Sequence, residues 1–345
     1  MRANILIFLS QILMCSATGQ SLIALHSNDD VSFYQTFNEA MTAAIDGDTL
    51  YLPARGFTEL IIDKAVHIVG IGYHPDSTSA TGDTHVSTYI KILNTASGGS
   101  IQGIRVFYYI QFGTSTSNDN VQNFLIKRCY LEQGIYFSCC GTNLEAMNNS
   151  VIECVIGGQV SGYNAQNNIF ANNVIYGPLI SWKTSLFSNN IFNNNSSDAM
   201  NTVDNCTFNN NIFTAEGYTD YSVNNNFFNN NIFGDMVGIT PCDIYDYSNT
   251  CDANVTNVNE SNFFLQWTDG SSISNYFLQD FHLSPSSPAT DAANDDGDCG
   301  IYGGIFPWKD GGIPHNPHIQ IQTISNATDE NGDLEINIKV QAQDN

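Results

Sequence analysis

Basic residues are scarce in this chain of 345 residues. It contains 10 Lys and Arg against 34 Asp and Glu, which gives a formal net charge of −24. A chain with this charge repels nucleic acid and anionic membrane surfaces, and we expect neither as a partner. It would also repel polysaccharides built from uronic acids unless a bound cation intervened.

Cysteine pairs at zinc-binding spacing are absent as well. The sequence holds 9 Cys, and no two of them are separated by two residues, so a zinc site is not expected. Cys242 and Cys251 are the pair best placed for a disulfide, which would close a small polar loop. Cys129 and Cys154 precede similar apolar phrases, which suits stacked thiols in a core.

The apolar run near the N-terminus is too short to cross a membrane. It extends from Ile5 to Met14, follows Arg2, and is succeeded by the small residues Ala17 and Gly19. A spanning helix needs about 20 apolar residues, so a membrane anchor is the weaker alternative. The pattern predicts a secretory signal peptide over residues 1–19, a secreted or cell-surface protein, and no transmembrane segment in the mature chain.

A short Asn-rich phrase recurs through the middle of the chain. Its starts differ by 22, 21 and 20 residues, and the four copies are Asn167–Phe170, Asn189–Phe192, Asn210–Phe213 and Asn230–Phe233. Self-similarity at this period predicts a solenoid whose coils pack on their neighbours. We expect one residue of each Ile-Phe pair to enter the core. The preceding Asn would turn stacked corners, because Asn tolerates left-handed backbone and forms amide ladders. A second Asn-Asn phrase within residues 167–176 leaves the coil register between 154 and 189 open.

Both ends of this repeat region carry other patterns. Helical spacing of apolar residues predicts one amphipathic helix of about three turns, formed by Phe33, Phe37, Ala40, Met41 and Ala44. Strand patterns follow at residues 49–52, 59–62, 66–70 and 89–93. Near the C-terminus, alternation at 318–321 and 334–340 around Asn331-Gly332 predicts a β-hairpin. A hairpin is marginal alone, so we expect it to pack on the solenoid.

Two stretches resemble the ends of secreted bacterial right-handed parallel β-helix proteins of the pectin-lyase-like superfamily. The opening one covers residues 37–53 and Ile68–Gly72, and the closing one covers Asp280–Asp291 and Asp298–Gly304. The resemblance implies an all-β, right-handed parallel β-helix over residues 48–308, with a capping-helix region at 20–47. A linker and the hairpin would occupy 309–345. It implies no single function, because the superfamily includes lyases, glycosidases, epimerases, adhesins and inert coils.

The sequence contains few groups that could catalyse cleavage of a polysaccharide. The resemblance implies that a lyase would need a carboxylate-bound cation beside an Arg or Lys base. Arg105 and Arg128 are the candidates, and the alternative is that both are solvated or paired with acids. A glycosidase needs two closely placed carboxyls, for which Asp29-Asp30 and Asp295-Asp296 are available. Neither pair is accompanied by the Gly-His-Gly or Arg-x-Lys phrases of the pectin-hydrolase branch. No His stands beside an acid or Ser in a recognisable nucleophilic arrangement.

Two residue sets are candidate binding sites. Large aromatic residues could stack on sugar rings or fill the core; these are Tyr108, Tyr109, Trp182 and Trp267. A carboxylate cluster could bind calcium or form a solvated acidic turn; its members are Asp291, Asp295, Asp296 and Asp298. The cluster does not have EF-hand spacing.

The sequence therefore predicts an exported parallel β-helix with a non-catalytic role, either binding carbohydrate or another surface ligand or serving as a structural element. The alternative is a polysaccharide lyase or glycoside hydrolase whose active site is not recognisable in the sequence. Electrostatic repulsion and the scarcity of basic residues argue against cleavage of acidic polysaccharides.

Overall fold

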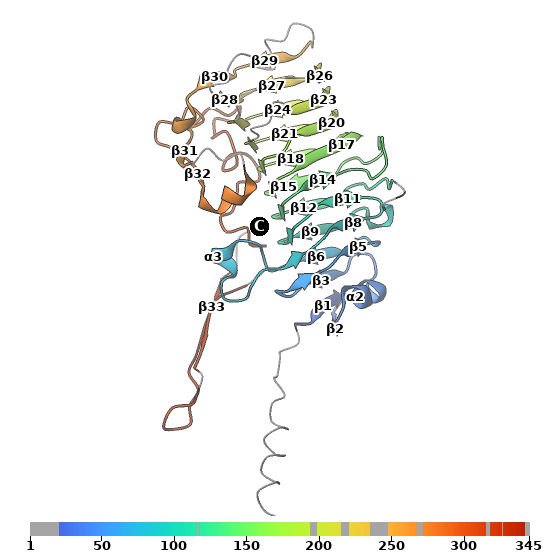
Figure 1. The fold of residues 1–345 in the computed structure, drawn as a ribbon, viewed down its shortest axis with the longest axis vertical. Coiled ribbons are helices and arrows are strands. Elements are labelled where there is room, and N and C mark those ends of the chain that lie inside the picture. The colour runs from blue at the N-terminus through green and yellow to red at the C-terminus, as the bar shows by residue number, and fades with distance from the viewer. Residues whose placement is uncertain are drawn as a thin grey trace, which may run out of the picture.

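The protein is a parallel β-solenoid of about nine turns with three parallel sheets (Figure 1). The computed structural model describes residues 21–114, 116, 118–193, 199–214, 221–234, 248–267, 272–314, 318–325 and 327–341. The expected signal peptide and Cys242 lie outside these residues. Each coil contributes one short strand to each sheet in turn, so strands adjacent in space are one coil apart in sequence.

The first sheet, called sheet A here, begins with two antiparallel strands and continues with parallel ones. Its spatial order is β2 (Asp30–Tyr34), β1 (Ile23–Ser27), β3 (Thr49–Tyr51), β6 (His67–Val69), β9 (Ser100–Gln102), β12 (Leu125–Lys127), β15 (Ser150–Ile152), β18 (Ile169–Ala171), β21 (Leu186–Ser188), β24 (Thr207–Asn209), β27 (Phe227–Asn229) and β29 (Thr250–Asp252). The predicted strands at 49–52 and 66–70 correspond to β3 and β6.

Sheets B and C complete each coil. Sheet B contains β4 (Gly56–Phe57), β7 (His85–Val86), β10 (Arg105–Val106), β13 (Tyr130–Leu131), β16 (Val155–Ile156), β19 (Val174–Ile175), β22 (Ile191–Phe192), β25 (Ile212–Phe213), β28 (Ile232–Gly234) and β30 (Val255–Val258). Sheet C contains β5 (Leu60–Ile62), β8 (Ile90–Ile92), β11 (Ile110–Phe112), β14 (Gly134–Tyr136), β17 (Gln159–Gln166), β20 (Leu179–Lys183), β23 (Met200–Asp204) and β26 (Tyr221–Asn224). The predicted strands at 59–62 and 89–93 correspond to β5 and β8.

Buried Asn side chains form a ladder along the corner that precedes sheet B. The Asn211 Oδ1 accepts hydrogen bonds from both the backbone N–H and the Nδ2 of Asn190, at 2.8 and 3.0 Å. Asn211 in turn donates in the same two ways to Asn231. The members of this ladder, one per coil, are Asn173, Asn190, Asn211, Asn231 and Asn254. The amide stacking predicted from the sequence is therefore present.

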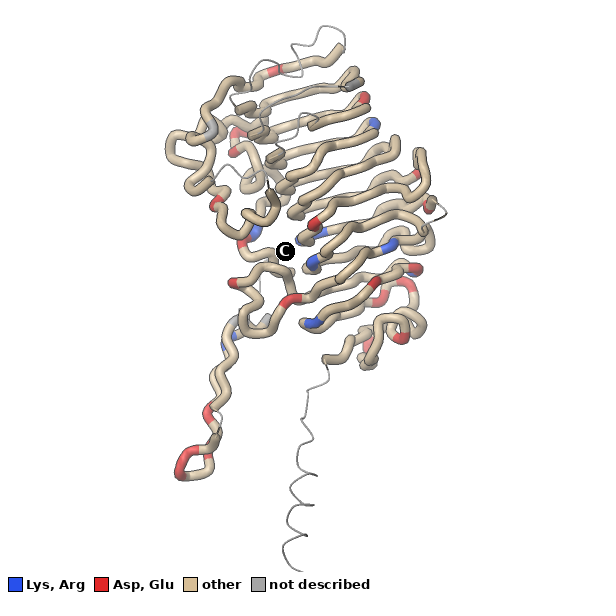
Figure 2. The backbone as a smooth tube through the Cα atoms, in the orientation of Figure 1, with Lys and Arg blue, Asp and Glu red and all other residues tan. Residues whose placement is uncertain are grey.

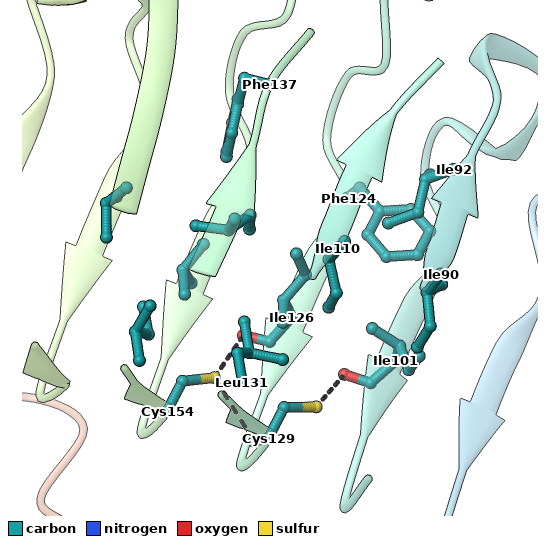
Figure 3. Close-up of a cluster of buried hydrophobic side chains, with 14 of the residues drawn as sticks. Ile90, Ile92, Ile101, Ile110, Phe124, Ile126, Cys129, Leu131, Phe137 and Cys154 are labelled. Carbon is teal, nitrogen blue, oxygen red and sulfur yellow. Dashed lines mark hydrogen bonds between the residues drawn. The ribbon is translucent and has the colours of Figure 1, made fainter. Parts of the chain in front are cut away.

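On earlier coils thiols continue the same ladder. The Cys154 backbone N–H donates to Asn173 Oδ1, and the Cys129 N–H donates to Cys154 Sγ. Both thiols are free and fully buried, and Figure 3 shows them in line within the core. The stacked core thiols expected from the sequence are confirmed.

Inside the coils, rings stack on their equivalents one coil away. Phe187 and Phe208 have ring centroids 4.9 Å apart, and Phe192 and Phe213 have centroids 4.6 Å apart. These separations match the spacing between neighbouring strands of a sheet, about 4.8 Å. The Phe of each phrase thus fills the interior.

The first copy of the repeated phrase belongs to a different sheet from the other three. Ile169 and Phe170 lie in β18 of sheet A, whereas Ile191, Ile212 and Ile232 pair with one another in sheet B. The sheet B partner in the earlier coil is Val174, which pairs with Ile191. The coil between these positions is therefore 17 residues long (191 − 174) instead of the apparent 22, and the open register is settled in favour of the second Asn-Asn phrase.

The segment expected to be the closing coil is not a further rung of the solenoid. The parallel strands end at β30, and the chain then turns back along the outer face of sheet B (Figure 1). We call residues 260–267 and 272–314 the return segment. It contains four short elements, η2 (Glu260–Asn262), β31 (Phe264–Gln266), η3 (Ile273–Leu278) and β32 (Asp280–Leu283), and β31 pairs antiparallel with β32.

The return segment explains why both residues of the three Ile-Phe pairs in sheet B are buried, whereas Ile169 of the first copy, in sheet A, is 38 % exposed. Ile212 faces outward from sheet B, yet its side chain is fully buried because the return segment lies on it. Gly300 sits so close that an added Cβ would lie 2.8 Å from Ile212 Cδ1. The solenoid therefore has two apolar cores, one inside the coils and one beneath the return segment.

The first Asn of each pair that precedes sheet B holds the return segment in place. These residues have left-handed backbone, as at Asn172 (φ 55°) and Asn210 (φ 57°), so their side chains point outward at the corner. Asn172 Nδ2 donates to the Ile301 carbonyl at 2.8 Å, and Asn210 Nδ2 donates to Asn294 Oδ1 at 3.0 Å. The two Asn of such a pair thus have different roles. The first Asn binds the return segment, and the second forms the ladder.

The elements at the two ends differ in part from expectation. The predicted helix is shorter, α2 (Phe37–Ala43), and it starts at a capping box formed by Thr36 and Glu39. Phe33 lies in β2 instead and is 63 % exposed. The predicted hairpin is confirmed as β33 (His318–Ile324) and β34 (Ile336–Gln341). It extends away from the coils, and its aliphatic side chains are exposed, so the expected packing on the solenoid is wrong for most of its length (Figure 1).

The ladder generates a testable prediction about stability. Replacing Asn211 by Ala leaves the buried Asn190 N–H and Nδ2 without their shared acceptor and removes the side-chain donor to the Phe187 carbonyl. We expect a loss of about 3 kcal/mol in the free energy of unfolding, measured by urea denaturation. Asn229→Ala, on the outer face of β27, is the matched control and should cost no more than about 0.5 kcal/mol. Equal losses in the two variants would contradict the structural role given to the ladder.

Candidate functional site

The aromatic residues proposed to stack on sugars do not form one surface. Trp182 is fully buried, and its Nε1 donates to the Val160 carbonyl at 2.9 Å, so it belongs to the core and cannot contact a ligand. Trp267 is half-buried and packs against the core beneath the return segment. Tyr109 is half-buried; its ring stacks on Tyr89 at 5.8 Å and meets Tyr136 in a T-shaped contact at 5.1 Å. Tyr108 alone is well exposed, at 47 %.

The carboxylates proposed as calcium ligands form a solvated turn at the surface. Asp298 Oδ1 accepts a hydrogen bond from the Asp291 N–H at 3.0 Å, and Asp295 Oδ1 accepts one from the Gly297 N–H. Asp296 is exposed. Within the described part of the chain, no group of three or more His, Cys, Asp or Glu side chains could hold a metal ion. Calcium binding by these four carboxylates stays a prediction.

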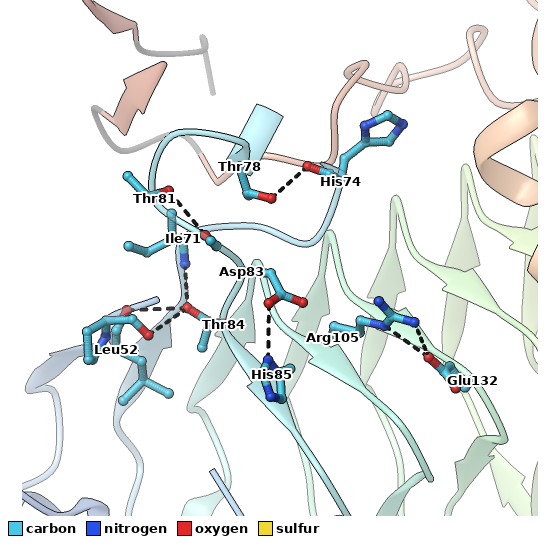
Figure 4. Close-up of polar contacts among 12 residues, drawn as sticks. Leu52, Ile71, His74, Thr78, Thr81, Asp83, Thr84, His85, Arg105 and Glu132 are labelled. Atoms are coloured by element: carbon cyan, nitrogen blue, oxygen red, sulfur yellow. Dashed lines mark hydrogen bonds and ion pairs between the residues drawn. The ribbon is translucent and has the colours of Figure 1, made fainter. Parts of the chain in front are cut away.

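The two arginines considered as lyase bases are both paired with acids. Arg105 donates to Glu132 at 2.6 Å, as Figure 4 shows, and both side chains are about 30 % exposed. Arg128 is buried and donates to Glu153 at 2.5 Å and to the Ile313 carbonyl at 3.0 Å. Arg128 occupies the same left-handed corner position as the outer Asn row, with φ 49°. It therefore anchors the end of the return segment and is not accessible as a base.

Charged residues are sparse along the coils, as Figure 2 shows. Three Asp and two His line a cleft together with aromatic residues. The cleft has a volume of about 500 Å³ and lies between helix α3 (Pro75–Thr78) on one side and the return segment on the other. Close approach of the two walls depends on Gly312. Its φ is +54°, and an added Cβ would lie 2.4 Å from Tyr73 Cζ.

Two hydrogen-bonded pairs of side chains, joined by ring stacking, line one wall of the cleft. His282 Nδ1 lies 2.7 Å from Asp280 Oδ1, and His282 Nε2 lies 3.8 Å from Asp310 Oδ2. The Tyr302 hydroxyl donates to Asp310 Oδ1 at 2.7 Å. The rings of His282 and Tyr302 stack with centroids 4.1 Å apart. The imidazole is thus held between two carboxylates and against an aromatic face.

The opposite wall carries His74 and Asp76, which begin helix α3. His74 Nδ1 accepts a hydrogen bond from the Asp76 N–H, and its ring meets Phe277 of the return segment edge-on at 5.2 Å. Figure 4 shows His74 directed away from the coils. A ligand in the cleft would therefore lie between two His-Asp sets, with Phe277 beside it.

Burial and hydrogen bonding perturb three of these groups. Burial opposes ionisation of Asp280, but hydrogen bonds from the His282 N–H and ring, together with its charge, hold the pKa of Asp280 below its ordinary value. Burial lowers the pKa of His74, against the opposing pull of Asp76 and Asp310. Burial and then the bond to Asp310 raise the pKa of Tyr302. Asp280 is thus charged and Tyr302 is a neutral donor near neutral pH.

Sequence reasoning missed this cleft. One wall comes from residues 74–77 and the other from residues 276–313, and only the return of the chain along sheet B brings them together. A local signal was present in Asp280-Phe281-His282, where a strand places Asp and His on the same side. Asp310, some 30 residues later, gave no such signal.

Comparison with known proteins identifies no relative: no family model, no curated protein and no solved structure matches the chain. No helix within the described residues is long and apolar enough to cross a membrane. The cleft is therefore interpreted from its own chemistry.

The two arginines provide a matched pair of variants. Arg128→Met removes the closer of the two cationic partners of buried Glu153, the other being Lys127 at 3.4 Å, and also removes the donor to the Ile313 carbonyl. We expect a loss of about 3 kcal/mol in unfolding free energy. Arg105→Met breaks a partly exposed pair and should cost at most about 1 kcal/mol. Denaturant unfolding of both variants checks this. Similar losses would show that burial of Arg128 has no special structural role.

Proposed function

We propose that this protein is an exported carbohydrate-binding β-helix that holds its ligand in the cleft without cleaving it. The observation that carries the proposal is the cleft of about 500 Å³, whose walls combine aromatic rings with carboxylate and imidazole groups. Pockets of roughly 300–1,000 Å³ are typical of small-ligand sites. The parallel solenoid supports the further proposal that the chain winds right-handedly, with α2 as a cap, like pectin-lyase-like proteins.

The chemistry of the walls suits a sugar. A sugar ring has C–H faces that pack on aromatic rings and hydroxyl groups that need hydrogen-bond partners. Phe277 and Tyr302 supply the apolar surface, while Asp310 and His282 supply acceptors and donors. His282 is fixed by Asp280 and by stacking on Tyr302, so little side-chain freedom is lost on binding.

A glycoside hydrolase is the second candidate function. The observation that favours it is the placement of His282 between Asp280 and Asp310, since hydrolysis uses two carboxyl groups as acid and base. Against it, Asp310 is already engaged by Tyr302, and the lowered pKa of Asp280 makes that group a poor proton donor near neutral pH. Binding without cleavage is therefore preferred.

The test is a panel of neutral, amino and uronic oligosaccharides, with binding measured by isothermal titration calorimetry. We expect at least one neutral or amino oligosaccharide to bind, and Phe277→Ala to weaken that binding about tenfold or more. Tyr108→Ala, an exposed tyrosine outside the cleft, is the control and should leave affinity unchanged.

Product analysis separates the two candidates. Reducing ends and unsaturated sugars are measured after long incubation, and we expect neither to accumulate. Release of reducing ends that Asp280→Asn or Asp310→Asn abolishes would establish the hydrolase instead. Binding that Tyr108→Ala removes and Phe277→Ala spares would move the site out of the cleft.

A further inference from the structure

The lining of the cleft is one-sided in charge. Its carboxyl and imidazole members are three Asp and two His, and it contains no Lys or Arg; these are Asp76, Asp280, Asp310, His74 and His282. The sequence neighbour Lys309 is not part of the lining. Below the cleft, Arg105 is neutralised by Glu132. A ligand in the cleft therefore meets carboxylates from both walls without a competing fixed cation in the lining.

Aromatic rings enclose these carboxylates. Phe277 lies edge-on to His74 and stacks on Tyr130 at 5.1 Å, which fixes its ring at the base of the cleft. Tyr302 presents its ring on the other side, stacked on His282. Aromatic faces attract cations through the ring quadrupole, and more strongly when water is excluded. Carboxylates and aromatic rings together favour an organic cation.

A metal ion fits the cleft less well than an ammonium group does. No group of three or more metal-ligating side chains is placed to hold an ion within the described residues. An ammonium needs only acceptors near its three N–H donors and tolerates longer, varied distances. The net charge of −24 also raises the local concentration of cationic ligands at the protein surface.

From these observations we propose that the ligand of the cleft carries a protonated amine, and that the sugar it binds is an amino sugar. This rests on the proposed carbohydrate-binding function. The ammonium lies between Asp310 on the return segment and Asp76 on α3, and the sugar ring packs on Phe277. Asp280 keeps His282 oriented, and Tyr302 keeps Asp310 oriented.

The experiment compares three oligosaccharide series of equal length: glucosamine, N-acetylglucosamine and glucose. Affinities are measured by calorimetry on the full chain. We expect the glucosamine series to bind about tenfold or more tightly than the glucose series, with an affinity that falls as salt rises. The N-acetyl series, which has lost the charge, should resemble glucose.

Two variants remove the same charge at different places. Asp310→Asn acts in the cleft, and because it removes a charge but keeps an acceptor oxygen, we expect it to weaken glucosamine binding about tenfold more than it weakens glucose binding. Asp296→Asn acts at an exposed position outside the cleft, where Asn tolerates the left-handed backbone, and should change neither. Asp76→Asn, on the other wall, serves if Asp310→Asn fails to fold, as judged by circular dichroism.

The possible outcomes distinguish the cationic ligand from carbohydrate binding in general. Equal affinity for the three series, unaffected by Asp310→Asn and Asp76→Asn, would overturn the cationic ligand and leave carbohydrate binding standing. Binding of a linear polyamine but of no oligosaccharide would support the cationic site and overturn the carbohydrate function. Binding of none of these ligands would overturn both. Loss of glucosamine binding in Asp296→Asn as well would assign the effect to net charge rather than to the cleft.

Discussion

This structure depends on one constraint: the backbone and amide groups at the corners of the coils must all form hydrogen bonds. A solenoid turn places main-chain N–H groups in a dry interior, and each must find an acceptor. In the ladder before sheet B, each Asn accepts twice from the preceding coil and donates to a main-chain carbonyl, as Asn211 does towards Phe187. Because the ladder must stay in register, changes in coil length fall away from this corner, as in sheet C, where the register between β17 and β20 shifts between Ser161 and Ala165. The Phe stacks follow the same spacing as the ladder.

The neighbouring left-handed residue determines what lies outside the solenoid. Its side chain points out from the corner, and along sheet B these side chains bind the return segment, which covers Ile191, Ile212 and Ile232. On an earlier coil the position is taken by Arg128, paired with Glu153 on the next. Like the Asn residues, Arg128 donates to a return-segment carbonyl. A charged pair thus replaces an amide without changing the docking geometry.

The parts of the fold that depend on local pattern could be predicted from the sequence, and the parts that depend on long-range docking could not. Strand positions, the solenoid period and the amide ladder all follow from residue types within one coil. The apparent 22-residue spacing was misleading because Asn167 and Asn189 precede different sheets, which identical phrases cannot reveal. Trp182 could be taken for a surface residue because the alternation of apolar and polar residues along a strand does not show which face of the strand points into the solenoid. The structure places Trp182 inside. The cleft could not be predicted, because it forms only when the chain reverses direction after β30.

Because the cleft has one wall on an early coil and one on the return segment, ligand binding and docking are thermodynamically coupled. A ligand that contacts both walls binds only the docked state, so by mass action it stabilises docking. The reverse also holds: the Arg128 bond to the Ile313 carbonyl holds the segment that carries Asp310, although Arg128 does not line the cleft. The buried pair of Arg128 and Glu153 therefore influences ligand affinity through the position of the wall that carries Asp310. The entropy lost in ordering this wall is lost when the chain folds, so it does not reduce the affinity for the ligand.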